Sequence, residues 1–203
     1  MKALIIDDEP PARRELRRLL NEFDWLEVAG EAGNIDQAEA MVGSLAPDLL
    51  FLDIQMPGGS GFDLLTRLEH VPAVIFTTAH DEHAVRAFEV DALDYLLKPI
   101  DPARLAEALT RVKSAHRQRA RRPDDVLEQI FVRDGPRCWF VPLREVRLLT
   151  SEGNYIRLSW GKTQPLLGRA LAALERRLDP NRFFRANRQQ IINLVLSGMW
   201  SSA

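Results

Sequence analysis

Cysteine is nearly absent from this sequence, and long apolar runs are missing. Cys138 is the single cysteine among 203 residues, so no disulfide can form within the chain. A lone thiol suits a reducing compartment such as the cytoplasm. No stretch approaches the ~18 consecutive apolar residues that span a bilayer, and the first residues lack a signal-peptide pattern. We therefore expect a cytoplasmic protein without a membrane segment.

Charge is distributed unevenly between the two halves of the chain. Residues 1–116 hold 11 Lys and Arg against 21 Asp and Glu, whereas residues 117–203 hold 16 against 8. This asymmetry predicts two domains with different partners, the basic one facing nucleic acid. A basic surface that binds nothing is the alternative that composition leaves open.

Five short apolar runs in the first half predict strands separated by amphipathic helices. The runs lie near 2–7, 26–31, 48–53, 73–78 and 94–97. Strands that are apolar throughout and alternate with helices indicate a parallel sheet covered on both faces. We expect an α/β domain over residues 1–116, with a doubly wound, flavodoxin-like sheet of five parallel strands. Such sheets bind ligands outside the carboxyl ends of their strands.

The second half has a different pattern. A polar and strongly basic stretch, stopped by Pro123, predicts a linker over residues 117–126. Short strand-like runs with Gly-containing turns follow, and Leu167, Leu171, Leu174 and Leu178 have the spacing of one short helix. We therefore expect a second, mainly β domain over residues 127–203.

Chemically active side chains follow the predicted strands at one edge of the first sheet. Asp7 and Asp8 end the first run, Asp53 the third, Thr78 the fourth, and Lys98 follows the fifth. Three crowded carboxylates repel one another without a cation, and their hard oxygens suit Mg²⁺. Phosphoryl transfer needs a carboxylate nucleophile, a metal, a cation and a hydroxyl in such an arrangement. Taken singly, Asp7 and Asp8 could cap a helix and Lys98 could be a surface lysine, but their joint placement makes Asp53 a candidate phosphoacceptor.

Residues 1–116 resemble the receiver domain of two-component response regulators. The matching stretches, in the same order and spacing, are Ile6-Asp7-Asp8-Glu9-Pro10, Leu52-Asp53-Ile54-Gln55-Met56-Pro57-Gly58, Phe76-Thr77-Thr78-Ala79 and Asp94-Tyr95-Leu96-Leu97-Lys98-Pro99. Haloacid-dehalogenase-like phosphatases share this chemistry, but Asp53 is followed by Ile54-Gln55 and lacks their Asp-x-Asp pattern.

The receiver resemblance implies a role for each of these residues. A partner histidine kinase would phosphorylate Asp53, and Mg²⁺ would be held by Asp7, Asp8, Asp53 and the Gln55 carbonyl. Lys98 would contact the phosphoryl group. Thr78 would turn its hydroxyl toward that group, and Tyr95 would fill the space that Thr78 leaves. The movement would shift an equilibrium between two states of the surface around Ala84 to Tyr95.

Residues 126–193 resemble the LytTR domain, the DNA-binding module of the LytR/AlgR type of response regulator. The matching stretches are Phe131-Val132-Arg133-Asp134-Gly135, Val141-Pro142-Leu143-Arg144-Glu145-Val146, Glu152-Gly153-Asn154-Tyr155-Ile156-Arg157-Leu158 and Phe184-Arg185-Ala186-Asn187-Arg188-Gln189-Gln190-Ile191-Ile192-Asn193. Loops of that domain enter major grooves, which makes Asn154, Tyr155, Arg157, Arg185, Asn187 and Arg188 the candidate DNA contacts. Alternatively, Arg157 is an outward strand residue paired with a neighbour.

The two resemblances together imply a cytoplasmic response regulator and not a metabolic enzyme. Phosphorylation of Asp53 would promote dimerisation and place paired DNA-binding domains on repeated promoter sites. The family's second domain continues beyond Asn193 with further strands, whereas this chain continues with residues 194–203. We therefore expect the DNA-binding domain to be incomplete. The alternative is a stand-alone receiver that acts through protein contacts, with a second domain that no longer binds DNA.

Overall fold

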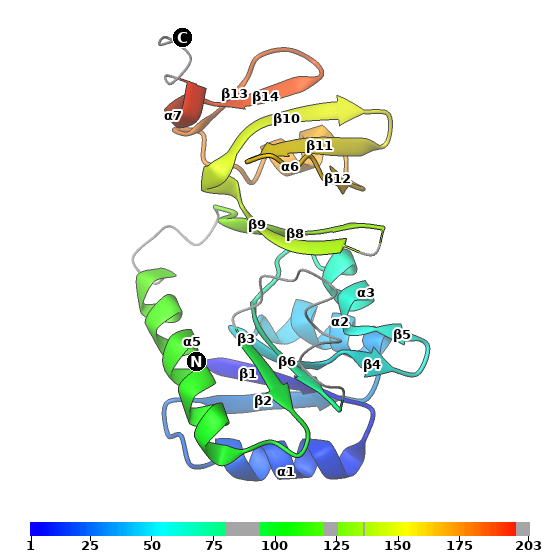
Figure 1. Ribbon diagram of the computed structural model, residues 1–203, viewed down its shortest axis with the longest axis vertical. Helices are drawn as coiled ribbons and strands as arrows, with labels where there is room; N and C mark the ends of the chain where they lie inside the picture. The colour runs from blue at the N-terminus through cyan, green and yellow to red at the C-terminus, as the bar shows by residue number, and fades with distance from the viewer. Residues whose placement is uncertain (80–93, 120–125, 136, 198–203) are drawn as a thin grey trace. The chain divides into compact units, whose positions relative to one another are not determined.

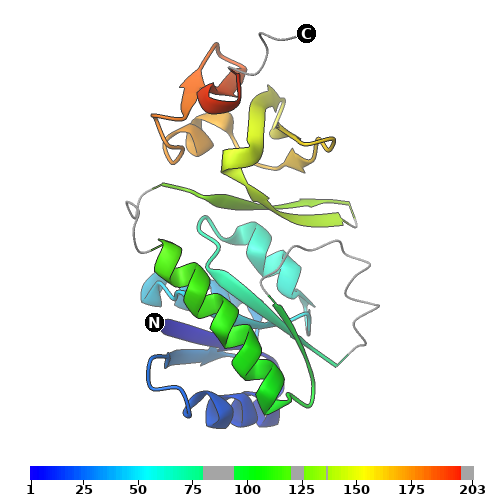
Figure 2. The ribbon, with the colours of Figure 1, turned by 60° about the vertical axis from the view of Figure 1, so that its left-hand side comes forward.

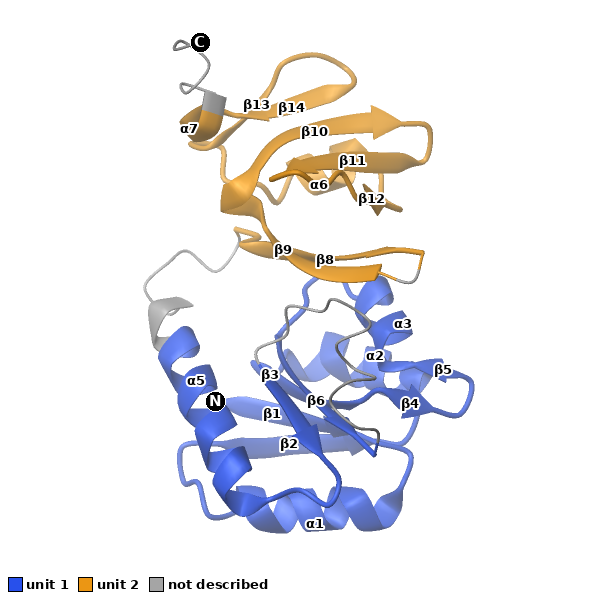
Figure 3. Cartoon of the chain, viewed as in Figure 1, with its two compact units in different colours: residues 1–122 blue, residues 123–203 orange. Residues whose placement is uncertain are grey.

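The computed structural model describes residues 1–79, 94–119, 126–135 and 137–197. The chain divides into two compact units, Met1–Arg122 and Pro123–Ala203 (Figure 3). Residues 84–93 of the expected relay surface and residues 120–125 of the expected linker lie outside the described residues. No helix in the described ranges is long and apolar enough to cross a membrane.

The first unit is built on a five-stranded parallel sheet in the order β2-β1-β3-β6-β7 (Figure 1). Its elements are β1 (Lys2–Ile6), α1 (Pro10–Leu20), β2 (Glu27–Ala32), α2 (Ile35–Leu45), β3 (Leu49–Asp53), β4 (Gln55–Met56), β5 (Gly59–Ser60), α3 (Gly61–Arg67), β6 (Ala73–Thr78), β7 (Asp94–Leu97) and α5 (Pro102–Arg119). The predicted doubly wound fold is confirmed, and each predicted strand lies within about one residue of its expected position, the scatter normal for element boundaries.

Both faces of this sheet are covered, which explains why its strands are apolar throughout. Ile5, Phe51 and Ile75 face α1 and α5 in one buried cluster. Their chain neighbours point to the opposite face because side chains alternate along a strand, and α2 and α3 lie on that side (Figures 1 and 2). The central strand β3 is buried along its whole length, so its last residue, Asp53, is held in a rigid part of the fold.

A carboxylate on β2 fastens the sheet edge to α1. Glu31 accepts hydrogen bonds from Arg17 Nε at 2.5 Å and from Arg13 Nε at 3.1 Å. Burial tends to raise the pKa of Glu31, but the two arginine hydrogen bonds outweigh it and hold the pKa below its ordinary value of 4.5. The folded state therefore binds this proton less tightly than the unfolded chain does.

The interaction of Glu31 with the two arginines makes the stability of the folded protein depend on pH. The contribution of Glu31 is present above the pKa of the unfolded chain and is lost as the pH falls through the lower folded pKa. We expect Glu31→Gln to lower the unfolding free energy by up to about 1 kcal/mol at pH 7, because the interaction is partly exposed, and by less at pH 3, which lies below the pKa of the unfolded chain. Urea unfolding at both pH values measures this difference. Glu27→Gln on the same strand, an exposed position, is the control that should show no such pH dependence.

The second unit is mainly β, as predicted. A five-stranded antiparallel sheet has the order β12-β11-β10-β14-β13, and β8 and β9 form a separate hairpin. The elements are β8 (Gln129–Asp134), β9 (Arg137–Pro142), η1 (Leu143–Glu145), β10 (Val146–Glu152), β11 (Tyr155–Trp160), β12 (Leu166–Leu167), α6 (Leu171–Glu175), β13 (Phe183–Arg185), β14 (Gln190–Asn193) and α7 (Leu194–Ser197).

The leucine spacing in this unit predicts a longer helix than the structure has. Helix α6 is limited to Leu171–Glu175, and Leu167 belongs to strand β12. Leu167, Leu171, Leu174 and Leu178 are nevertheless all buried in the core of the unit. The spacing therefore correctly indicates that the four leucines are buried together. It does not show that they lie on one helix, because a short strand, a short helix and turns supply them.

Candidate functional site

The topological switch point of the parallel sheet lies between β1 and β3. In the sheet, β2 lies next to β1 on one side of this point, and β6 lies next to β3 on the other side. Asp7 and Asp8 come directly after β1, and Asp53 is the last residue of β3. Oxygen atoms of these three carboxylates lie within 4.8 Å of one another. Asp7 and Asp53 are buried, and Asp8 is partly exposed, so the cluster has one side open to solvent.

Lys98 connects this cluster to the far strand of the sheet. Its backbone N–H donates to the Thr78 carbonyl at 2.8 Å, which continues the β6–β7 ladder by one residue. Its Nζ lies 2.6 Å from Asp53 Oδ2 and 2.7 Å from Asp7 Oδ2. Glu9 Oε2 is 3.7 Å away. The ammonium thus lies between the two buried carboxylates.

The two partners of this contact have raised pKa values for opposite reasons. Burial raises the pKa of Asp53, and the hydrogen bonds from Lys98 and from the Gln55 N–H offset this only in part. Burial tends to lower the pKa of Lys98, but its hydrogen bonds with Asp53 and Asp7 outweigh burial, and the pKa is raised. Lys98 is therefore cationic at neutral pH. The Asp53 carboxylate is short of stabilising charge, which an additional cation would supply.

The donor set fits Mg²⁺. Three carboxylates with hard oxygen atoms converge on one place, and a single ammonium neutralises only part of their charge. Asp7 Oδ1 and Asp53 Oδ1 each accept a backbone N–H, from Glu9 at 2.9 Å and from Gln55 at 3.1 Å. These bonds fix the orientation of both carboxylates. Lys98 binds their Oδ2 atoms, and each oxygen keeps a second lone pair with which it could bind a metal.

The chain directly after Asp53 is held by a capped helix. The Ser60 hydroxyl accepts a hydrogen bond from the Asp63 N–H, and the Asp63 carboxylate accepts from the Ser60 N–H. This capping box starts α3 at Gly61, whose N–H donates to the Ile54 carbonyl at 3.0 Å. A Cβ atom at Gly61 would lie 2.4 Å from the Asp53 carbonyl oxygen. Only glycine allows the helix to approach the end of β3 so closely.

Replacing this glycine should therefore displace the phosphoacceptor candidate. We expect Gly61→Ala to lower the unfolding free energy by about 1–3 kcal/mol, the usual effect of overpacking. Gly43→Ala is the matched control, because Gly43 lies within α2 and a Cβ there meets nothing within 4 Å. Alanine at that exposed helical position should stabilise the protein by up to about 1 kcal/mol. Thermal unfolding of the two variants would contradict this reading if both shifted in the same direction.

Thr78 and Tyr95 lie on the adjoining strands, β6 and β7. Thr78 is buried at the end of β6. The Tyr95 ring stacks on Phe76 with a centroid distance of 5.5 Å and an interplanar angle of 17°. Phe76 in turn contacts Phe62 of α3 at 5.0 Å. Tyr95 thus stacks on Phe76, which itself contacts α3, and lies on the same face of the sheet as Thr78.

An ion-pair cluster around a buried aspartate lies on the opposite face of β7 and was not predicted from the sequence. Asp94 is buried, and its carboxylate binds Arg104 Nη2 at 3.1 Å and Arg111 Nη1 at 2.7 Å. The same carboxylate accepts the Tyr95 N–H at 2.9 Å. Arg104 and Arg111 are seven residues apart, which places them on one helix face, and this spacing is the signal that could have revealed the pair. The cluster ties α5 to the strand that carries Tyr95 and precedes Lys98.

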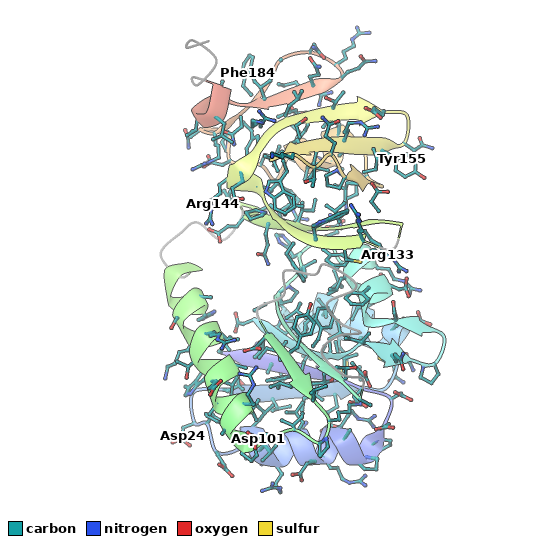
Figure 4. All side chains as sticks on the ribbon, viewed as in Figure 1. Asp24, Asp101, Arg133, Arg144, Tyr155 and Phe184 are labelled. Carbon is teal, nitrogen blue, oxygen red and sulfur yellow. The ribbon has the colours of Figure 1, made fainter. Side chains whose placement is uncertain are left out.

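Two loops meet at one end of the antiparallel sheet in the second unit. The β10–β11 turn contains Gly153, with φ +61°, and Asn154. The β13–β14 loop covers residues 186–189, and its Gln189 carbonyl accepts the Ser151 N–H of β10 at 2.7 Å. The exposed Tyr155 side chain projects at this end (Figure 4). Five of the six candidate DNA contacts therefore lie in these loops or at the strand ends next to them. The sixth, Arg157, lies further along β11.

Some of these candidates are engaged within the chain. Arg157 makes a two-point contact with Glu152, with N–O distances of 2.5 and 2.6 Å, which is the pairing that the sequence left open. Arg185 binds Glu175 and two loop carbonyls. Asn187 accepts the Gln189 N–H at 2.8 Å through Oδ1. Asn154, Tyr155 and Arg188 are exposed.

Comparisons with known families identify both domains. The family model of the response regulator receiver domain matches residues 3–110, and that of the LytTr DNA-binding domain matches residues 137–195. The chain belongs to the response regulators of this two-domain type. It regulates transcription through DNA binding, and both matched domains point to a regulatory protein.

Relatives and solved structures give the extent of the similarity. This response regulator is 38% identical to the transcriptional regulatory protein BtsR of Escherichia coli K12, over 96% of its length and 83% of the relative's. It is 37% identical to the positive alginate biosynthesis regulatory protein of Pseudomonas aeruginosa, over 95% and 82%. The receiver domain of AraT from Geobacillus stearothermophilus is similar in structure, with a TM-score of 0.52 and 35% identity over 59% of this chain and 97% of that one.

Proposed function

We propose that this response regulator acts in the cytoplasm and is switched when a sensor histidine kinase phosphorylates Asp53. The observation that carries the proposal is the position of Lys98 Nζ, 2.6 Å from Asp53 and 2.7 Å from Asp7 at the switch point of the sheet. A carboxylate oxygen of Asp53 would attack the phosphorus of the kinase phosphohistidine. The phosphorus–nitrogen bond would break, and an acyl phosphate would form on Asp53 as the kinase histidine leaves.

The residues around Asp53 would each meet one requirement of this transfer. Lys98 would exchange its contact with the Asp53 carboxylate for one with a phosphoryl oxygen, and Thr78 would donate its hydroxyl to another. Asp7, Asp8, Asp53 and the Gln55 carbonyl would hold Mg²⁺, which when bound supplies charge neutralisation for the phosphoryl oxygens. The fixed backbone at β3 and α3 would keep Asp53 in place throughout.

Phosphorylation would reach the DNA-binding domain through a shift between two states of the receiver. Tyr95 would move as Thr78 turns toward the phosphoryl group, and the stacking with Phe76 would change with it. The altered surface would pair two receivers, and a dimer would place two LytTR domains on repeated promoter sites. Residues at the loop end of the antiparallel sheet, including Asn154, Tyr155 and Arg188, would face the DNA. Two binding events on one duplex would then raise apparent affinity without any new base contact.

A gel shift of the full chain tests this proposal. The phosphoryl mimic beryllofluoride, added with Mg²⁺, should strengthen binding to a duplex selected by the protein from a random-sequence pool. The measurement is made at about 50 and 200 mM salt, because contacts to phosphates weaken steeply with salt. Specific binding that survives the higher salt and depends on beryllofluoride supports the proposal.

Two other results would contradict parts of it. Binding of equal strength to selected and unselected duplexes would mean that the basic surface attracts DNA only by charge. No binding at either salt concentration, with a beryllofluoride-dependent dimer still seen by sedimentation, would point to the alternative function. In that case the receiver would act through protein contacts alone.

A further inference from the structure

The β13–β14 loop is held by a network centred on Arg185, the last residue of β13. Its Nε donates to the Asn187 carbonyl at 2.7 Å and its Nη2 to the Arg188 carbonyl at 2.5 Å. Its Nη1 binds Glu175 Oε2, at the end of α6, at 2.6 Å. Each nitrogen of the guanidinium thus has a partner within the same unit.

The rest of the loop is ordered around this network. The Asn187 side chain accepts the Gln189 N–H at 2.8 Å and donates to Gln190 Oε1 at 3.0 Å. The Ala186 N–H donates to the Gln190 carbonyl at 3.0 Å, and the Gln189 carbonyl accepts the Ser151 N–H. The carbonyl groups of three successive loop residues, 187 to 189, are therefore directed to donors inside the domain. Arg188 itself is exposed.

We infer that Arg185 is a positioning residue for the DNA-facing loop and that it does not contact bases or phosphates itself. This inference rests on the proposed DNA-binding function. A guanidinium presents donors in a fixed planar fork, which can bind two carbonyl groups and one carboxylate at once. By keeping carbonyl oxygens turned away from the DNA, Arg185 limits their repulsion of phosphate groups. The loop then presents Arg188 in one arrangement and loses less entropy on binding than a mobile loop would.

Glu175 is the part of this arrangement that separates positioning from direct contact. If Arg185 contacted DNA, Glu175 would compete with the DNA for the guanidinium, and its removal would strengthen binding. If Arg185 positions the loop, Glu175 anchors it, and removal of this acid should weaken binding although the protein becomes more basic. The two roles thus predict effects of opposite sign for one substitution.

The experiment uses the full chain and two readouts, the first without DNA. Hydrogen exchange of the amides of residues 185–191 and of Ser151 should become faster in Arg185→Lys and Glu175→Ala, and less so in Glu175→Gln, which keeps an acceptor. Glu145→Ala removes an acid that bonds Trp160 and lies before β10, so it should leave exchange in the loop unchanged. Unchanged exchange in Arg185→Lys would overturn the inference whether or not the protein binds DNA.

The second readout is affinity for the duplex selected by the wild-type chain. Arg185→Lys and Glu175→Ala should each weaken binding about tenfold, comparable with the loss of one good base contact, and Glu145→Ala should not weaken it. Stronger binding by Glu175→Ala, with loop exchange unaltered, would assign Arg185 to direct DNA contact and overturn the inference. Failure of the wild-type chain to select any duplex would contradict the proposed function instead, and the exchange measurement would still decide the role of Arg185.

Discussion

Asp53→Asn is expected to abolish phosphorylation of the chain by a small acyl phosphate in the presence of Mg²⁺. An amide nitrogen is a poor nucleophile, and its oxygen carries no charge, so the rate should fall by more than about 10³-fold. The fold should survive, because asparagine has nearly the same shape. The buried carboxylate that it replaces has a raised pKa, which means that its charged form is disfavoured where it lies. Phosphate uptake is measured on gels that retard phosphorylated protein.

The control for this experiment is an aspartate of the same domain that does not belong to the cluster of Asp7, Asp8 and Asp53. Asp24 is exposed after α1 (Figure 4), and Asp24→Asn should be phosphorylated as fast as the wild-type chain. Asp7 and Asp8 are within reach of the same donor, so the substitution also discriminates among the three carboxylates. Undiminished labelling of Asp53→Asn would move the phosphoacceptor to another residue and would remove the main support of the proposed switch.

Much of the receiver fold could be predicted because its strands are buried on both sides. An uninterrupted apolar run such as 49–52 has few other places in a soluble domain, and the polar residue that ends it then lies at the sheet edge. The gathering of Asp7, Asp53 and Lys98 follows from this topology alone. What could not be predicted is the pairing, since Lys98 could have bound Asp7, Asp53 or water. The structure places its Nζ between both carboxylates.

The second unit shows the limit of sequence reasoning more clearly. Charge composition identified a basic domain, but it could not say which arginines are used internally. Arg157 and Arg185 both bind glutamates, and the relevant partners are 5 and 10 residues away in sequence. Hydrophobic spacing also failed for Leu167, because a strand and a helix can contribute to the same core. Surface pairing and short elements depend on tertiary context, which periodicity does not report.

Lys98→Met should separate two roles of the lysine, one in stability and one in phosphorylation. Methionine keeps the apolar stem and removes the charge, leaving Asp7 and Asp53 buried, close together and without their shared ammonium. Removing one partner of a buried ion pair costs about 3–5 kcal/mol, and we expect the lower end because the lysine is 15% exposed. Urea unfolding in metal-free buffer measures the loss of unfolding free energy. Unfolding is followed by hydrogen exchange of the amides of β1 and β3, so that the measurement reports on the receiver domain alone.

Mg²⁺ should restore the stability of the Lys98→Met variant but not its rate of phosphorylation. A cation bound by the carboxylates at about one hundred times its dissociation constant adds about 2.7 kcal/mol to the unfolding free energy, which nearly offsets the lost ammonium. Phosphorylation should nevertheless stay about 10²-fold slower, because no donor replaces Lys98 at the phosphoryl oxygens. Lys2→Met, at an exposed position of β1, should change neither quantity appreciably. If Mg²⁺ restored phosphorylation together with stability, Lys98 would serve only to balance charge in the resting site, and its assignment to the phosphoryl group would be wrong.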